Sequence, residues 1–317
     1  MKAIVYTEYG PPDVLQLKEV EKPVPTDDEL LIKVHAVSVN RSDWEGLIGK
    51  PLYARIGGLR KILGSDVAGR VEVAGKNNRE FQPGDEVFGE MENYHGGFAE
   101  YVCTRGKDWA RKPASLTFEQ AAAIPQAGVI ALQGIYKKGQ VQPGQRVLIN
   151  GGGGGAGSFA IQLAKLYSAE VTGVDNTGKL DFMRSLGADH VIDYTRQDFT
   201  KTGKQYDLIL DPIAHRSVFA YSRALRTNGS CFFVGGSVAT LFQILLLGPW
   251  IRRSTSKKVH LLAVQRNRKD LEFITELCEA GKIVPRIDRR YPLSQVPEAL
   301  RYLGEERAKG KIVITVL

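Results

Sequence analysis

The feature that most constrains the fold is a run of glycines between an apolar segment and a helix-forming segment. Residues 146–150 (RVLIN) predict a buried strand, GGGGGAG follows at 151–157, and SFAIQLAK at 158–165 predicts a helix. Gly152, Gly154 and Gly157 satisfy GxGxxG in the strand–turn–helix context of dinucleotide-binding folds. Such glycines permit a tight turn, backbone approach to a pyrophosphate and close helix–strand packing.

A flexible turn is the alternative interpretation, because five consecutive glycines match many patterns by chance. The context favours phosphate binding, since the N–H groups and the positive dipole end of a helix N-terminus attract phosphates. We therefore expect the cofactor to contact Gly152, Gly154, Gly155, Ala156 and Gly157.

A second predicted strand, EVTGVD at 170–175, ends in Asp175. A dinucleotide fold carries an acid about 20 residues beyond the loop, where it binds the ribose hydroxyls. Such an acid repels a 2′-phosphate, so NAD(H) is slightly favoured over NADP(H). Lys179 and Arg184 follow closely and offer pairing to that phosphate instead. Asp175 is alternatively the N-cap of the helix predicted over KLDFMRSLGA, and both roles can coexist.

The pattern of predicted elements changes near Ser115. Short β-rich runs separated by turn signals precede it and predict a barrel-like or sandwich-like unit. Apolar strands that alternate with helices follow it, as in a doubly wound parallel sheet. We predict an α/β protein with a Rossmann domain over 123–264 and a β-rich domain over 1–122, which residues 265–317 complete.

Charge and cysteine content narrow the class of protein. The chain carries 43 Lys+Arg against 35 Asp+Glu, for a net charge of +8. Its basic clusters are not interleaved with aromatic residues, so we expect no specific nucleic-acid partner. The three cysteines are far apart and form no CxxC pair, which argues against disulfides and a Cys-rich zinc module. With no signal-peptide or transit-peptide pattern at the N-terminus, we expect a cytoplasmic protein.

The most apolar run, 241–251, is too short to span a bilayer, which takes about 20 residues. An ordinary buried helix is the first interpretation. Coverage of a cleft and a homodimer contact are alternatives, and we expect a homodimer. Weak association with a membrane surface is another alternative, because Arg252, Arg253, Lys257 and Lys258 follow.

Motifs in order along almost the whole chain resemble the zinc-free quinone oxidoreductase (zeta-crystallin-like) branch of the medium-chain dehydrogenase/reductase family. They include VNRSDWEGLIG (39–49), LGSDVAGRVEVAG (63–75), AAAIPQAGVIALQGI (121–135) and LGADHVIDY (186–194). The resemblance implies a GroES-like catalytic domain around the Rossmann domain, with the active site in the cleft between them. It also implies NAD(P)H-dependent hydride transfer to a quinone or an α,β-unsaturated carbonyl compound.

Zinc-dependent members carry a cysteine where this chain has Asn40 and a histidine where it has Ser65. Neither replacement is a serviceable zinc ligand, so we expect no zinc. Without zinc nothing acidifies a simple alcohol, whereas hydride addition to a conjugated acceptor gives a delocalised anion. A dinucleotide-binding structural or regulatory protein with little turnover and a zinc-free alcohol dehydrogenase are the alternatives.

The resemblance also implies roles for residues of the first domain. Asn40 would donate to a developing oxyanion or fix the nicotinamide, or it caps a turn. Trp44 would be a platform for a flat substrate or a core residue. Glu45 stands where relatives have tyrosine or lysine, which puts proton donation there in doubt unless burial raises its pKa. Tyr53 would be a substitute proton donor, or its role is ordinary side-chain packing.

Further cofactor contacts are expected in four segments. Gln126 to Val129 resembles the nicotinamide-contacting segment, and Tyr194 resembles an adenosine-side contact. Gly235, Gly236 and Ser237 follow the fifth predicted strand, and ligands bind at the carboxyl ends of strands in open α/β sheets. Residues 307–311 lie in a region that often touches cofactor. The alternative for all of these residues is that they serve the local backbone conformation and do not contact the cofactor.

Overall fold

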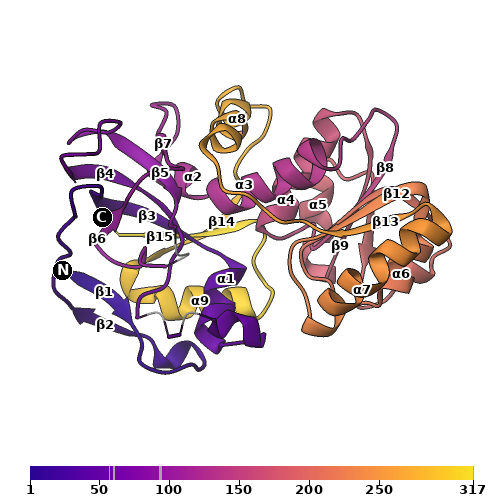
Figure 1. Cartoon of the computed structure of the whole chain (residues 1–317), viewed down its shortest axis with the longest axis horizontal. Helices are drawn as coiled ribbons and strands as arrows, with labels where there is room; N and C mark the ends of the chain where they lie inside the picture. Colours follow the sequence, from indigo (N-terminus) through magenta and orange to yellow (C-terminus); the bar gives the residue numbers. More distant parts are fainter. Residues whose placement is uncertain (57, 60, 93–94, 317) are drawn as a thin grey trace. The chain divides into compact units, whose positions relative to one another are not determined.

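The computed structural model describes residues 1–56, 58–59, 61–92 and 95–316 and divides the chain into two compact units. The first unit comprises residues 1–126, 266–280 and 285–317, and the second comprises residues 127–265 and 281–284. Figure 1 labels their elements. Leu317, the last residue of the segment 265–317, lies outside the described residues.

The first unit is built on a seven-stranded, mostly antiparallel sheet with the order β14-β15-β3-β4-β5-β7, in which β6 also pairs with β3. A two-stranded ribbon of β1 and β2 accompanies it. The strands are β1 (Lys2–Val5), β2 (Gln16–Glu19), β3 (Leu30–Val39), β4 (Asp66–Ala74), β5 (Glu86–Glu90), β6 (Tyr101–Thr104), β7 (Ala110–Arg111), β14 (Ile287–Pro292) and β15 (Lys311–Thr315). The helices are α1 (Arg41–Ile48), α2 (Phe118–Ala122), α8 (Arg268–Glu279) and α9 (Val296–Gly304).

The C-terminal strand β15 places the end of the chain beside the start of α1. It runs antiparallel to β3, with Ile312 opposite Val39. Lys311 therefore begins its strand where β3 gives way to Asn40. This register brings together two polar residues that are 271 positions apart in the sequence.

The second unit contains a six-stranded, wholly parallel sheet with the order β10-β9-β8-β11-β12-β13. Its strands are β8 (Arg146–Asn150), β9 (Glu170–Asp175), β10 (His190–Asp193), β11 (Tyr206–Asp211), β12 (Leu225–Phe233) and β13 (Lys258–Leu261). Its helices are α4 (Gly155–Leu166), α5 (Leu180–Ser185), α6 (Val218–Ala224) and α7 (Val238–Thr255), and α3 (Pro125–Ala131) leads into it. Figure 1 shows α4 and α5 on one side of this sheet and α6 and α7 on the other.

This strand order is that of a Rossmann fold, in which the order reverses between β8 and β11 and ligands bind at the carboxyl ends of the strands. The α/β fold class is confirmed. Within the described residues, no helix is long and apolar enough to cross a membrane.

Candidate functional site

The glycine loop of the second unit joins β8 to α4, with Gly154 at the N-cap of the helix. A Cβ atom on Gly157 would lie 2.1 Å from the carbonyl oxygen of Gly151, so only glycine lets the helix approach the loop. Gly151 has a φ of +68°, which also favours glycine. Gly155, Ala156 and Gly157 form the first turn, where N–H groups lack acceptors within a helix. These residues fit the pyrophosphate of a dinucleotide.

Asp175 ends β9 and is nearly fully buried. Its carboxylate accepts hydrogen bonds from the N–H groups of Gly153 (3.0 Å) and Asn176 (2.9 Å). It also pairs with the buried Lys179, with an N–O distance of 3.3 Å. The carboxylate therefore ties the glycine loop to β9, a role that the sequence did not indicate.

The helix-cap alternative for Asp175 is wrong, because α5 begins after Lys179 without a side-chain cap, and Asn176 caps the 3₁₀ turn Thr177–Lys179 that precedes it. The Oδ1 atom of Asn176 accepts from the N–H of Gly178 at 3.1 Å. Of the two cations considered for a 2′-phosphate, Lys179 is held by Asp175 and Arg184 pairs with Asp181 at 2.6 Å.

Other expected cofactor residues lie at or near the carboxyl edge of the same sheet. Tyr194 follows β10, is 37% exposed, and its N–H donates to the carbonyl of Asp175. Gly235 and Gly236 follow β12, and Ser237 caps α7 through a bond from the N–H of Thr240. A Cβ on Gly236 would lie 2.6 Å from that of Ala214, which supports a backbone-fit role. Val129 is buried in α3.

A buried polar cluster lies in the first unit around Asn40, at the start of α1. Asn40 is 6% exposed, and Ser65, Asp66 and Lys311 are buried with it. The Nζ atom of Lys311 donates to Oδ1 of Asn40 at 2.5 Å and lies 3.6 Å from Oδ2 of Asp66. The Nδ2 atom of Asn40 donates to Oγ of Ser65 at 3.0 Å.

These contacts fix the orientation of the Asn40 amide. A lysine ammonium only donates hydrogen bonds, so the amide oxygen must face Lys311 and the NH₂ group must point the other way. One hydrogen of the NH₂ group is donated to Oγ of Ser65. The Asn40 side chain also hydrogen-bonds Asp66, which opposes the rise in the pKa of that carboxyl.

The cluster continues to Gln126 and Glu90. The side-chain amide of Gln126 donates to Oε1 of Glu90 at 2.7 Å, and its backbone N–H lies 3.3 Å from both carboxylate oxygens of Asp66. Sequence reasoning missed Glu90, the last residue of β5. Its only signal was the DEVFGE segment, in which nothing distinguishes Glu90 from Glu86, and both residues are partly exposed.

Burial dominates the electrostatics of this cluster. It raises the pKa of Glu90 to about 8, assisted by the negative charge of Asp66, and raises that of Asp43 to about 7. Burial also raises the pKa of Asp66, while the charge of Lys311 opposes that shift. The pKa of Lys311 is lowered by its own burial. Glu90 therefore stays largely protonated at neutral pH.

The remaining expected residues of the first unit lie nearby along α1 and just after it. Asp43 accepts from the N–H groups of Asn40 and Gly64, which orders the loop. The Trp44 ring packs against Gly304 of α9, where a Cβ would lie 2.3 Å away. Glu45 pairs with Arg41 at 3.5 Å, and burial raises its pKa. Tyr53 is partly buried in a short 3₁₀ helix, Leu52–Arg55.

The donor atoms at the zinc-ligand positions of this fold do not suit zinc. Asn40 and Ser65 are hydrogen-bonded to each other, and an amide and a hydroxyl are poor substitutes for thiolate and imidazole. In the part of the chain that the structure describes, no three His, Cys, Asp or Glu side chains are grouped to hold a metal.

The raised pKa of Glu90 predicts a pH-dependent stability. The folded chain retains a proton that the unfolded chain releases above its ordinary pKa near 4.5, so stability falls as pH rises toward about 8. Glu90→Gln removes this contribution. Its unfolding free energy relative to wild type should rise by up to about 1.4 kcal/mol per pH unit over this range.

Urea unfolding at several pH values measures this difference. Glu86→Gln is the matched control on the same strand, because Lys112 and Arg70 lower the pKa of Glu86. Parallel stability curves for wild type and Glu90→Gln would show that Glu90 ionises normally.

Comparison with known proteins places these features in a family. An alcohol dehydrogenase GroES-like domain matches residues 26–114, and a zinc-binding dehydrogenase domain matches residues 186–314. The chain is 34% identical to a 2-methylene-furan-3-one reductase from Solanum lycopersicum, over 99% of this chain and 79% of that protein. It is 32% identical to an NADPH-dependent alkenal/one oxidoreductase from Arabidopsis thaliana, over 99% and 79% of the two chains.

Among solved structures, the quinone oxidoreductase from Coxiella burnetii matches with a TM-score of 0.90. It is 30% identical, and the match covers 100% of this chain and 99% of that one. The sequence and the backbone of this chain are thus similar to those of known proteins over essentially the whole length. The chain belongs to the medium-chain dehydrogenase/reductase family, together with quinone oxidoreductases and enone reductases.

Proposed function

We propose that this protein reduces quinones or α,β-unsaturated carbonyl compounds with NAD(P)H and without catalytic zinc. The observation that carries the proposal is the Asn40 amide, which Lys311 and Ser65 hold in one orientation. Relatives named as a 2-methylene-furan-3-one reductase, an alkenal/one oxidoreductase and a quinone oxidoreductase support this substrate class.

The chain's own residues supply binding and charge stabilisation. Gly155, Ala156 and Gly157 would hold the pyrophosphate at the start of α4. The dinucleotide, when bound, supplies the hydride. The NH₂ group of Asn40 would donate to the oxygen on which negative charge develops, as an oxyanion hole does. Because its orientation is fixed beforehand, the amide does not need to reorganise during reaction.

A single amide donor gives enough charge stabilisation for the reduction of a conjugated acceptor. Hydride addition to an enone or a quinone yields a delocalised enolate or hydroquinone anion, which needs less stabilisation than an alkoxide. Tyr53 remains the proposed proton donor, with solvent as the other source, and Trp44 and Glu45 remain proposed substrate contacts.

Steady-state oxidation of NADH and NADPH with a panel of quinones and enones tests the activity. Turnover with conjugated acceptors and none with simple alcohols supports the proposal. Tight cofactor binding without turnover on any acceptor would identify a dinucleotide-binding protein instead.

Asn40→Ala should lower kcat/KM for the best acceptor by roughly a hundredfold, the usual effect of removing one oxyanion donor. NAD(P)H affinity, measured by quenching of protein fluorescence, should stay within about twofold because the glycine loop is untouched. Asn77→Ala is the matched control, since Asn77 bonds the exposed Asp28 on the same unit. Equal kcat/KM for Asn40→Ala and wild type would rule out this donor.

We further propose that the negative charge of Asp175 favours NADH over NADPH. Asp175→Ser removes that charge and frees Lys179 to pair with a 2′-phosphate. The ratio of kcat/KM for NADPH to that for NADH should rise about tenfold, or about 1.4 kcal/mol, at low salt.

Asp181→Ser is the control for this substitution, because Asp181 is exposed and pairs with Arg184. Its cofactor ratio should match that of wild type. An unchanged ratio in Asp175→Ser would mean that Asp175 only anchors the loop.

A further inference from the structure

Two carboxyl groups face each other across neighbouring strands of the first unit. The register of β4 and β5 places Asp66 directly opposite Glu90. Cβ atoms at such positions are about 5 Å apart, and like charges there are destabilising. Gln126 contacts both residues, through its backbone N–H to Asp66 and through its side-chain amide to Glu90. The two acids therefore form one unit, which we call the Asp66–Glu90 pair.

The same two strands show a favourable arrangement four residues away. Glu86 lies on the same face of β5 as Glu90, because side chains alternate along a strand. Its partner on β4 is Arg70, and the two side chains form an ion pair with an N–O distance of 2.7 Å. Natural chains depart from favourable local pairing mainly at functional or strained sites. The Asp66–Glu90 pair is such a departure.

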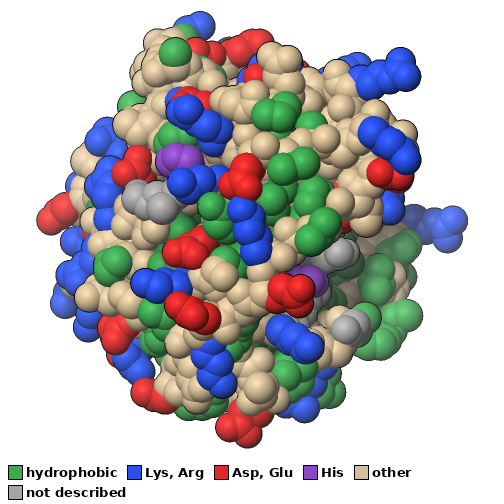
Figure 2. Space-filling model, turned by 90° about the vertical axis from the view of Figure 1, so that its left-hand side faces the viewer, with side chains coloured by type: hydrophobic (Ala, Val, Ile, Leu, Met, Phe, Trp, Pro, Cys, Tyr) green, Lys and Arg blue, Asp and Glu red, His purple; other side chains and the backbone are tan. Residues whose placement is uncertain are grey.

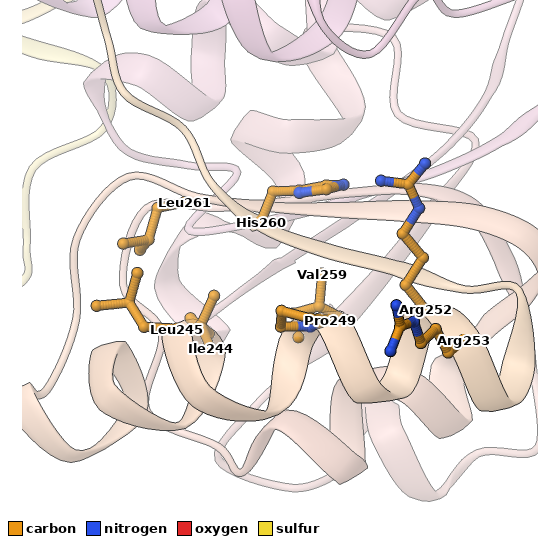
Figure 3. Close-up of a pocket in the computed structure, with 9 residues that line it drawn as sticks. Ile244, Leu245, Pro249, Arg252, Arg253, Val259, His260 and Leu261 are labelled. Carbon is orange, nitrogen blue, oxygen red and sulfur yellow. The ribbon is translucent and has the colours of Figure 1, made fainter.

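Burial distinguishes this pair from charges at the surface. Basic and acidic side chains are interspersed on the face of the molecule in Figure 2. In Figure 3, Arg252 and Arg253 lie beside the groove between α7 and β13, and both residues are exposed in this chain. Dissolved ions screen exposed charges, whereas Asp66 is fully buried. Two carboxyl groups that share a buried site do not both ionise readily, so one of them keeps its proton.

Lys311 decides which acid keeps the proton. Its Nζ atom lies 3.6 Å from Oδ2 of Asp66 and favours the ionised form of that residue. Burial and then the charge of Asp66 raise the pKa of Glu90 to about 8. The hydrogen bond from Gln126 and the charges of Arg266 and Lys311 oppose this rise. At neutral pH, Lys311 and Asp66 are thus charged while Glu90 is not.

Loss of the Glu90 proton would change the surroundings of Asn40. Lys311 donates to the Asn40 amide and balances the charge of Asp66. A carboxylate at Glu90 would add a negative charge beyond the one that Lys311 balances, and it would attract the ammonium away from the amide oxygen. Negative charge that develops on an acceptor would then meet a more negative cluster, which weakens its stabilisation.

We propose that Glu90, held uncharged opposite Asp66, is a positioning residue for hydride transfer. It acts through Asp66 and Lys311, keeping the ammonium on the Asn40 amide and a second negative charge out of the cluster. Glu90 itself does not touch the acceptor, and the proton donor proposed above is unchanged. This inference rests on the proposed function.

The pH dependence of turnover tests this role. With the best conjugated acceptor, wild-type kcat should fall about tenfold between about pH 7 and about pH 9, because the active form loses its proton with a pKa of about 8. The KM of the acceptor should stay within about twofold, since Glu90 does not contact it. Glu90→Gln has no proton to lose at this position, so its kcat should change less than about twofold over the same range.

Two further variants serve as controls. Glu86→Gln removes an acid from the same face of β5 and should show the same tenfold fall in kcat as wild type, because Glu86 faces Arg70. Glu90→Asp keeps a titrating carboxyl group and should retain the fall. Because ionisation of Glu90 also lowers stability, thermal melting at each pH confirms that the loss of kcat is not unfolding.

The outcomes separate this inference from the proposed function. An active wild-type enzyme whose kcat does not fall between these pH values would overturn the role of Glu90 and leave the proposed function standing. A fall that persists in Glu90→Gln would assign the titration to another group, such as Asp43 with its pKa of about 7, and would also overturn it. Absence of turnover with every conjugated acceptor at neutral pH would refute the proposed function and this inference with it.

Discussion

The polar cluster of the first unit depends on the buried ammonium of Lys311. A buried charge is costly unless it is paired and hydrogen-bonded, and here Asp66 supplies the opposite charge while Asn40 supplies a neutral acceptor. The pairing of β15 with β3 brings these groups together. Loss of Lys311 would leave Asp66 buried without its cation and would free the Asn40 amide to rotate. The contacts that offset the free-energy cost of burying Lys311 also set the direction of the Asn40 amide donor.

The cofactor side of the molecule depends on a different constraint, the close packing of the glycine loop. Gly157 admits no side chain because its helix rests on the carbonyl of Gly151. Asp175 holds the loop from β9 through the N–H of Gly153. The loop therefore has a fixed shape before any dinucleotide arrives, which reduces the ordering cost of binding.

Local pattern in the sequence predicted most of the strands and helices, because turn signals and apolar periodicity are short-range features. It also predicted the glycine loop, and the family resemblance singled out Asn40 and Ser65, which the structure joins by a hydrogen bond. It could not predict the Lys311–Asn40 contact, which depends on strand pairing across nearly the whole chain, or the raised pKa of Glu90. The cap alternative for Asp175 was wrong, because a 3₁₀ turn capped by Asn176 separates Asp175 from α5. The exposure of one side of α7 could not be predicted either, because the helix carries apolar residues on both its buried and its exposed side.

In the proposed reaction an oriented amide, rather than a metal, stabilises the charge that develops during hydride transfer. The most direct test measures bound zinc by elemental analysis, together with NAD(P)H oxidation by the best quinone or enone before and after treatment with phenanthroline. We expect no stoichiometric zinc and an unchanged kcat/KM after chelation. About one tightly held zinc per chain, with activity lost on chelation and restored by added zinc, would contradict it.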